Sequence, residues 1–276
     1  MFKRIISLAI LLLSAALFSC TDQSGEIDYN PNVLAAKDYI RAEDAALEIL
    51  NAFFKGIHDT AVINSGFNYI DACSVRYYPD GDSMTFGYGE VNRLCQDNKF
   101  RRGRYKAEFS GDVFDEGVMA DLKTDQLFVD DLAYEITMLI TNQGLNISNH
   151  PEYRVQITSS LLILPDTNKI HGVSITSDWT MEWAEGFLTP TIHEDDTYLI
   201  TGTASGISSD LYQFSVTTQE ALRDYLDCNW ISTGFSQFTV PEAAYPTGTI
   251  DYLTEDGCFN EFHFYFNENL FYEFIK

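Results

Sequence analysis

From residue 73 to the C-terminus, apolar and polar residues alternate, and turn-forming residues interrupt the pattern about every ten positions. In RGRYKAEFSGDVF, for example, Tyr105, Ala107 and Phe109 alternate with charged residues, and EYRVQITSSLLIL, GVSITSDWTMEW, TYLITGTASG and LYQFSVTT follow the same style. Successive side chains of a strand point to opposite faces, so each segment would bury one face. The pattern predicts a mainly β chain, an antiparallel meander of about ten strands arranged as a sandwich, an open barrel or an extended sheet.

The C-terminal segment FNEFHFYFNENLFYEFIK predicts a final hairpin. Alternation places Phe262, Phe264 and Phe266 on one face, and Asn267-Glu268-Asn269 would form the turn. We expect the three phenylalanines to close the core.

One amphipathic helix is expected before the alternating region. Its apolar positions recur at helical spacing, and a polar set follows the same period two residues earlier, about 200° around the axis. The apolar set is Ala46, Leu50, Phe53 and Ile57, and the polar set is Asp44, Glu48, Asn51 and Lys55. Lys55 and Gly56 are typical of a helix end. We expect one buried and one solvated face, with the helix packed on the sheet, because its polar side is acidic whereas a membrane-surface helix is usually basic.

The N-terminus has the features of a secretory signal. Lys3 and Arg4 precede about 14 apolar or small residues, a run that is too short to span a bilayer. The run ends at Leu17-Phe18-Ser19-Cys20, which resembles the lipobox of bacterial lipoproteins. We therefore expect Cys20 to be the lipidated first residue of the mature chain, held on a membrane by its acyl chains.

Four further cysteines are expected to form two disulfides, because an exported chain with an even number of cysteines meets an oxidising compartment. Three pairings are possible. Both CSVRYYPDGDSMTFGYGEVNRLC and CNWISTGFSQFTVPEAAYPTGTIDYLTEDGC begin and end in cysteine around a strand, a turn and a second strand. This texture predicts Cys73–Cys95 and Cys228–Cys258, each closing a hairpin and each worth about 3 kcal/mol.

The predicted organisation has a signal peptide at 1–19, a polar tether at 20–32 and a β-rich domain with its helix at 33–276. The alternative divides this domain into two units, 33–190 and 191–276. Removal of residues 1–19 leaves 15 basic and 41 acidic side chains, a net charge of −26. Such a chain repels nucleic acid, so we expect no nucleic-acid partner.

The segments DWTMEWAEGFLTPTIHEDDTYLITGTASG, CNWISTG and TIDYLTEDGC resemble a group of exported, acyl-anchored, all-β proteins of the Bacteroidota. The resemblance covers about residues 73–276. Members favour glycine at the position of Leu253 and aspartate at that of Phe259, so the second cysteine loop would turn differently here. The resemblance implies an outer-membrane lipoprotein, periplasmic or surface-exposed, and it assigns no functional residue.

Motifs with a known chemistry are absent from the sequence. HEDDT at 193–197 begins like the HExxH zinc box, but Thr197 stands where the second histidine belongs. Glu182 and Glu185 lie too close along one strand to predict an acid/base pair. Asp80, Asp82 and the acidic run 194–196 lack the spacing of a calcium loop. We predict no catalytic residue, metal or cofactor.

The remaining candidate is DWTMEW. Trp179, Met181 and Trp183 share one strand face, about 7 Å apart, and would form a stacking platform for sugar rings or an apolar partner if that face were open. If it were closed, they would belong to the core. We therefore predict a non-catalytic binding or assembly module for a glycan or an envelope protein. The alternative is a hydrolase with a loop-built site, acting on polysaccharide or peptide.

Overall fold

The computed structural model describes residues 30–70, 73–77, 81–163, 172–228, 230–253, 258, 261–267 and 270–275. Cys20 and the expected signal peptide lie outside these ranges. The elements are, in chain order, α2 (Pro31–Ile57), α3 (Thr60–Ser65), β1 (Phe67–Ile70), β2 (Ser74–Tyr77), β3 (Ser83–Leu94), β4 (Phe100–Phe109), β5 (Met119–Val129), β6 (Leu132–Leu145), β7 (Pro151–Ile163), β8 (Val173–Glu185), the 3-10 turn η1 (His193–Asp195), β9 (Thr197–Ile207), β10 (Gln213–Tyr225), β11 (Ile231–Thr239), β12 (Thr247–Asp251), β13 (Glu261–Asn267) and β14 (Leu270–Ile275).

The strands form one continuous antiparallel sheet in which each strand pairs with its neighbours in the chain, from β1 at one end of the strand order to β14 at the other. The predicted mainly β meander is confirmed, and its strands form a single sheet, so the chain is not a sandwich. The described residues form fourteen strands instead of about ten, and β1, with only four residues, is too short to show an alternating pattern. Pairing of β8 with β9 carries the sheet across the 190/191 boundary without interruption.

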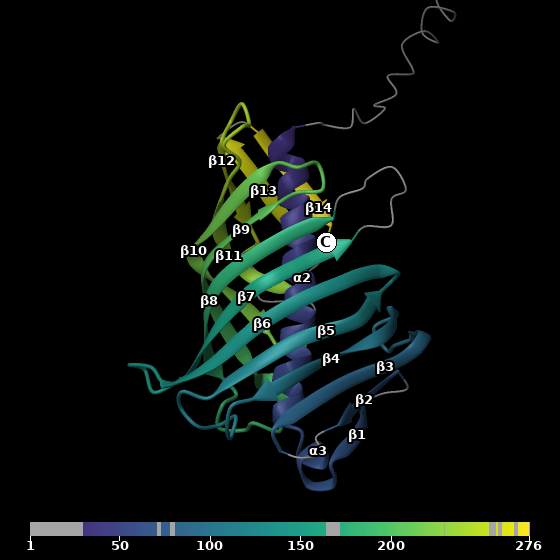
Figure 1. Ribbon diagram of the computed structural model, residues 1–276. Helices are drawn as coiled ribbons and strands as arrows, with labels where there is room; N and C mark the ends of the chain where they lie inside the picture. The colour runs from purple at the N-terminus through teal and green to yellow at the C-terminus, as the bar shows by residue number, and fades with distance from the viewer. Residues whose placement is uncertain are drawn as a thin grey trace, which may run out of the picture.

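The sheet curls around α2, which runs along its inside (Figure 1). Nineteen of the 27 helix residues are buried. The helix was expected to have one solvated face, and this expectation is only partly right, because Asn51 is 91 % buried and Asp38 and Glu43 are buried as well. Aromatic side chains of more than one strand contact the helix. The ring of Phe54, for example, lies 4.9 Å from that of Tyr198 in β9 and 4.9 Å from that of Tyr153 in β7, between centroids. A pattern of one apolar stripe cannot show that a curved sheet covers the flanks too.

The helix begins at Pro31, two residues before the predicted start of the β-rich domain at residue 33. Asn30 caps it, since its side-chain oxygen accepts a hydrogen bond from the Asn32 backbone N–H at 3.1 Å. Pro31 follows at a position where a missing N–H is tolerated. The other end, at Ile57 with His58 as cap, agrees with the predicted stop signals.

Glycines allow the long strands to bend around the helix. Gly103 has φ 89°, and a Cβ there would lie 1.9 Å from the carbonyl oxygen of Gln126 in β5. Gly202 has φ 143°, with the carbonyl oxygen of Asp178 at 2.2 Å from a Cβ. The pairing register shifts beside Gly103, as at a β-bulge, and such irregularities increase local twist. The resulting curvature is what lets one sheet enclose one helix.

Both predicted disulfides are present, Cys73–Cys95 with a Cα–Cα distance of 5.1 Å and Cys228–Cys258 with 5.4 Å. The first closes the β2–β3 hairpin, because one cysteine precedes β2 and the other follows β3. The second spans β11 and β12. Stable disulfides of this kind indicate an oxidising, non-cytoplasmic compartment. Within the described residues, no helix is long and apolar enough to cross a membrane.

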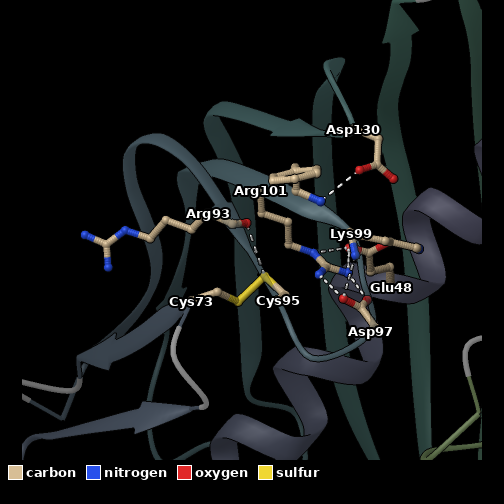
Figure 2. The surroundings of a disulfide bond; sticks show 9 residues. Glu48, Cys73, Arg93, Cys95, Asp97, Lys99, Arg101 and Asp130 are labelled. Atoms are coloured by element: carbon tan, nitrogen blue, oxygen red, sulfur yellow. Dashed lines mark hydrogen bonds and ion pairs between the residues drawn. A yellow bond between two sulfur atoms is a disulfide. The ribbon is translucent and has the colours of Figure 1, made fainter.

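An ionic network beside the first disulfide joins the sheet to the helix (Figure 2). Glu48 of α2 accepts hydrogen bonds from Lys99 and Arg101, both at 2.8 Å. Arg101 also donates two hydrogen bonds to the carboxylate of Asp97, at 2.8 and 2.6 Å. Burial acts against the charge on Arg101, yet the two carboxylates raise its pKa overall. The network explains why Glu48, one of the predicted polar residues of the helix, can face the sheet.

The final hairpin matches its prediction. β13 and β14 pair with Asn267 opposite Leu270, and Phe262, Phe264 and Phe266 are all buried in the core.

Candidate binding site

A cavity of about 520 Å³ opens at the end of the sheet where α2 terminates. Its wall contains Ile57 and His58 from the end of the helix, and residues from three loops, 110–118 between β4 and β5, 145–151 between β6 and β7, and 186–196 between β8 and β9. We call these segments the three rim loops. Four aromatic side chains, Phe114, Tyr153, Trp183 and Phe187, line it together with the polar residues His58, Thr60, Glu116, Asn142 and Thr191.

Hydrogen bonds of Asn142 hold the first rim loop against the end of β6. Its backbone N–H donates to the carbonyl of Val118 at 3.0 Å, and its side-chain amide donates to the carbonyls of Val113 and Phe114 at 3.3 and 3.1 Å. The amide oxygen accepts from the N–H of Gly144 at 2.8 Å. Asn142 is buried, so these bonds satisfy its side chain and fix the position of Phe114 at the cavity wall.

His150 joins the second rim loop to the third. Its Nδ1 lies 2.6 Å from a carboxylate oxygen of Glu182 in β8, and its ring lies 5.1 Å from that of Phe187. Glu185, by contrast, lies 3.5 Å from Arg223 of β10. The two glutamates therefore have separate partners, His150 for Glu182 and Arg223 for Glu185.

The third rim loop is anchored on a buried carboxylate. Asp196 accepts a hydrogen bond from the indole N–H of Trp183 at 2.9 Å, and its second oxygen lies 3.2 Å from Nδ1 of His193. Gly186 makes this possible: its φ is 85°, and a Cβ there would lie 2.2 Å from Oδ1 of Asp196. The HEDDT segment thus serves to hold the loop and Trp183 in place.

His58 lies between the helix end and the cavity. Its ring packs against Trp183 at 4.9 Å and Phe114 at 5.3 Å between centroids. Burial, reinforced by nearby His193 and opposed by Asp196, lowers the pKa of His58 to about 4. The imidazole is therefore neutral at neutral pH, and this wall of the cavity carries no positive charge.

The predicted stacking platform is not on an open face. Trp179 is 4 %, Met181 0 % and Trp183 3 % exposed, and all three belong to the core. The alternation correctly placed them on one face, but that face is the inner side of the sheet, which the helix covers. Trp183 alone of the three lines the cavity.

Sequence reasoning missed the rim of the cavity. Phe114, Leu145, Leu188 and Ile192 are exposed, and Ile147, at the tip of the second rim loop, is fully exposed. The signal available was the presence of large apolar residues within three turn-rich segments, SGDVFDEGV, LNISNH and GFLTPTI. Nothing in the sequence shows that these turns meet at one place.

Within the described ranges, no group of three or more histidine, cysteine, aspartate or glutamate side chains could hold a metal ion, and Asp80 lies outside them. No protein family model, curated protein or solved structure matches the chain. The resemblance to exported lipoproteins of the Bacteroidota therefore stays a prediction.

Proposed function

We propose that this chain is a non-catalytic binding or assembly module, anchored to the outer membrane by a lipid on Cys20, and that its cavity receives a glycan or part of an envelope protein. The observation that carries the proposal is the combination of an aromatic-lined cavity with exposed apolar side chains on all three rim loops.

The cavity has the size and chemistry of a ligand site. Such sites commonly measure about 300–1,000 Å³ and combine apolar walls with a few polar groups. Exposed apolar residues gathered on one part of a surface mark interaction sites, whereas isolated ones need no explanation. Here five such residues belong to the three rim loops. The first loop is bonded to the end of β6 through Asn142, and the second contacts the third through His150 and Phe187.

The direction of the helix supports a role away from the membrane. A helix of 27 residues is about 40 Å long at 1.5 Å per residue. In the sequence the proposed anchor precedes the start of the helix at Pro31, whereas the cavity lies at the other end of the helix, beside Ile57. An anchored molecule would therefore present the cavity at its far end, toward partners in the periplasm or outside the cell.

A hydrolase is less well supported. Two carboxylates facing one another across a site would favour it. Among the described residues that line the cavity, Glu116 is the one carboxylate.

Binding through the rim can be tested on a glycan array and on immobilised envelope proteins. We expect a Leu145→Ser/Leu188→Ser variant to lose the partner that the wild type retains, since both side chains are exposed rim residues. The control is Val91→Ser/Leu94→Ser, which removes two similarly exposed apolar side chains from β3. Equal binding by both variants would contradict the proposed site.

The lipid anchor requires a separate experiment. Cells expressing the full chain should incorporate radiolabelled palmitate into the protein and place it in the outer-membrane fraction, and the Cys20→Ser variant should incorporate none. Label on the Cys20→Ser protein would refute lipidation at this residue.

A further inference from the structure

The apolar rim is accompanied by unbalanced negative charge. The three rim loops contain the exposed acids Asp112, Asp115, Glu116, Glu194 and Asp195, and none of them contains lysine or arginine. Their two histidines are already engaged, His150 with Glu182 and His193 with the buried Asp196.

The outer face of the sheet differs, because several of its acids are paired with basic residues. Arg154 binds Asp178, Arg104 binds Asp125 and Lys123 binds Asp121, with closest N–O distances of 2.6, 2.6 and 2.7 Å. The rim loops contain no lysine or arginine that could form such pairs within them, and this is the place where apolar side chains are exposed.

The exposed apolar side chains and the negative charge of the rim together define which kind of ligand the cavity would bind. An apolar side chain can enter the aromatic cavity, and a positive charge beside it would meet the rim acids, as in interfaces with complementary potentials. An anionic glycan would be repelled, and a neutral one would leave the acids and the apolar tips unmatched. The neutral His58 in the wall adds no opposing positive charge.

We infer that the occupant of this site is a polypeptide segment of another protein that carries an apolar or aromatic side chain next to lysine or arginine. The inference rests on the proposed function and narrows it from glycan or envelope protein to a basic, apolar protein segment.

Selection from a random peptide library on the immobilised protein provides the test. The retained peptides should be enriched in Lys or Arg adjacent to Leu, Phe, Tyr or Trp, and they should not be retained by the Leu145→Ser/Leu188→Ser variant. One retained peptide is then synthesised, and its affinity is measured by calorimetry at low and high salt.

The contribution of rim charge is isolated with two matched triple variants. Asp115→Asn/Glu116→Gln/Glu194→Gln should weaken binding of the synthetic peptide about tenfold or more and reduce its salt dependence, because close charge pairs across an interface are lost.

The control, Glu135→Gln/Glu220→Gln/Glu242→Gln, removes the same number of exposed negative charges from elsewhere in the chain and should change the affinity by less than about threefold. Equal losses in the two triple variants would show general attraction to an acidic protein and would overturn the inference.

Other outcomes separate the inference from the proposal beneath it. The inference of a basic segment would be refuted if the protein bound peptides without basic residues, neutral glycans or phosphatidylethanolamine vesicles, and if that binding required Leu145 and Leu188. The proposal of a binding site at the rim would then still stand. Binding that is unaffected by the Leu145→Ser/Leu188→Ser change would refute both the basic segment and the proposed binding site at the rim.

Discussion

Deleting the phenol oxygen of Tyr252 should destabilise the protein through one buried carboxylate. Glu43, on α2, is 1 % exposed, and one of its oxygens accepts a hydrogen bond from Tyr39 at 2.6 Å while the other accepts from Tyr252. Because both oxygens act as acceptors, the group behaves as an ionised carboxylate. A hydrogen bond to a charged group contributes about 1.5–3 kcal/mol, and Tyr252→Phe removes one while leaving the ring in place.

We therefore expect Tyr252→Phe to lower the free energy of unfolding by about 2 kcal/mol, a shift of about 4–8 °C in Tm for a chain of this size. Urea titration followed by tryptophan fluorescence measures it, with an unchanged slope as evidence that the unfolding transition is the same. Tyr245→Phe is the control, since Tyr245 is 49 % exposed and its loss of a hydroxyl should change stability by less than about 0.5 kcal/mol.

A double variant with Tyr39→Phe sharpens the test. Two donors that share one carboxylate should show a coupling of at least about 0.5 kcal/mol, because the second deletion leaves Glu43 without either phenol. If Tyr252→Phe and Tyr245→Phe unfold at the same urea concentration, Glu43 is not held by charge-assisted bonds and the reasoning fails.

Three further predictions concern separate features. His58 has a folded-state pKa of about 4, below that of an unfolded histidine, so the unfolded chain binds the extra proton between about pH 6.5 and 4 and stability should fall as the pH is lowered through this window. The urea midpoint of the His58→Gln variant should fall less over the same pH range than that of the wild type. Equal pH dependence of the two midpoints would argue against burial of a neutral ring. Leu253 has φ 77°, a left-handed conformation that strains most residues other than glycine. Thermal unfolding of the Leu253→Gly variant should therefore show a stability higher by up to about 1 kcal/mol, and a lower stability would mean that the packing lost with the side chain outweighs the strain relieved. Replacing Cys73 and Cys95 by serine should lower the unfolding free energy by about 3 kcal/mol, and a loss below about 1 kcal/mol in denaturant titrations would contradict the loop-entropy argument.

Local patterns predicted the parts of this fold that depend on near neighbours. Alternation at Tyr105, Ala107 and Phe109 identified a strand and its buried face, and the strand–turn–strand texture between cysteines identified both disulfides. A meander is favourable for such reasoning, because every strand pairs with the next one in the chain.

Properties of the whole sheet were out of reach. Alternation tells which side chains share a face but not which face is covered, so the environment of Trp179 and Trp183 was left open between platform and core. The cavity depends on three turns brought together by strand length and curvature. Its anchors are polar residues with partners in other elements: Asn142 of β6 bonds to the first rim loop, and Asp196 bonds to Trp183 of β8. The left-handed backbone of Leu253, with φ 77°, was equally out of reach, because leucine gives no local signal for a conformation that favours glycine.

The enclosed helix sets an order for assembly of the chain. Glu43 and its partner Tyr252 are 209 positions apart, so a chain exported from its N-terminus, as we propose, would deliver the helix to the oxidising compartment long before the strands that must surround it. During that export the apolar side of the helix would not be fully covered until β12 and β13 arrive. The last strands would then complete the enclosure of α2, and a chain truncated before them would leave the helix open to proteases.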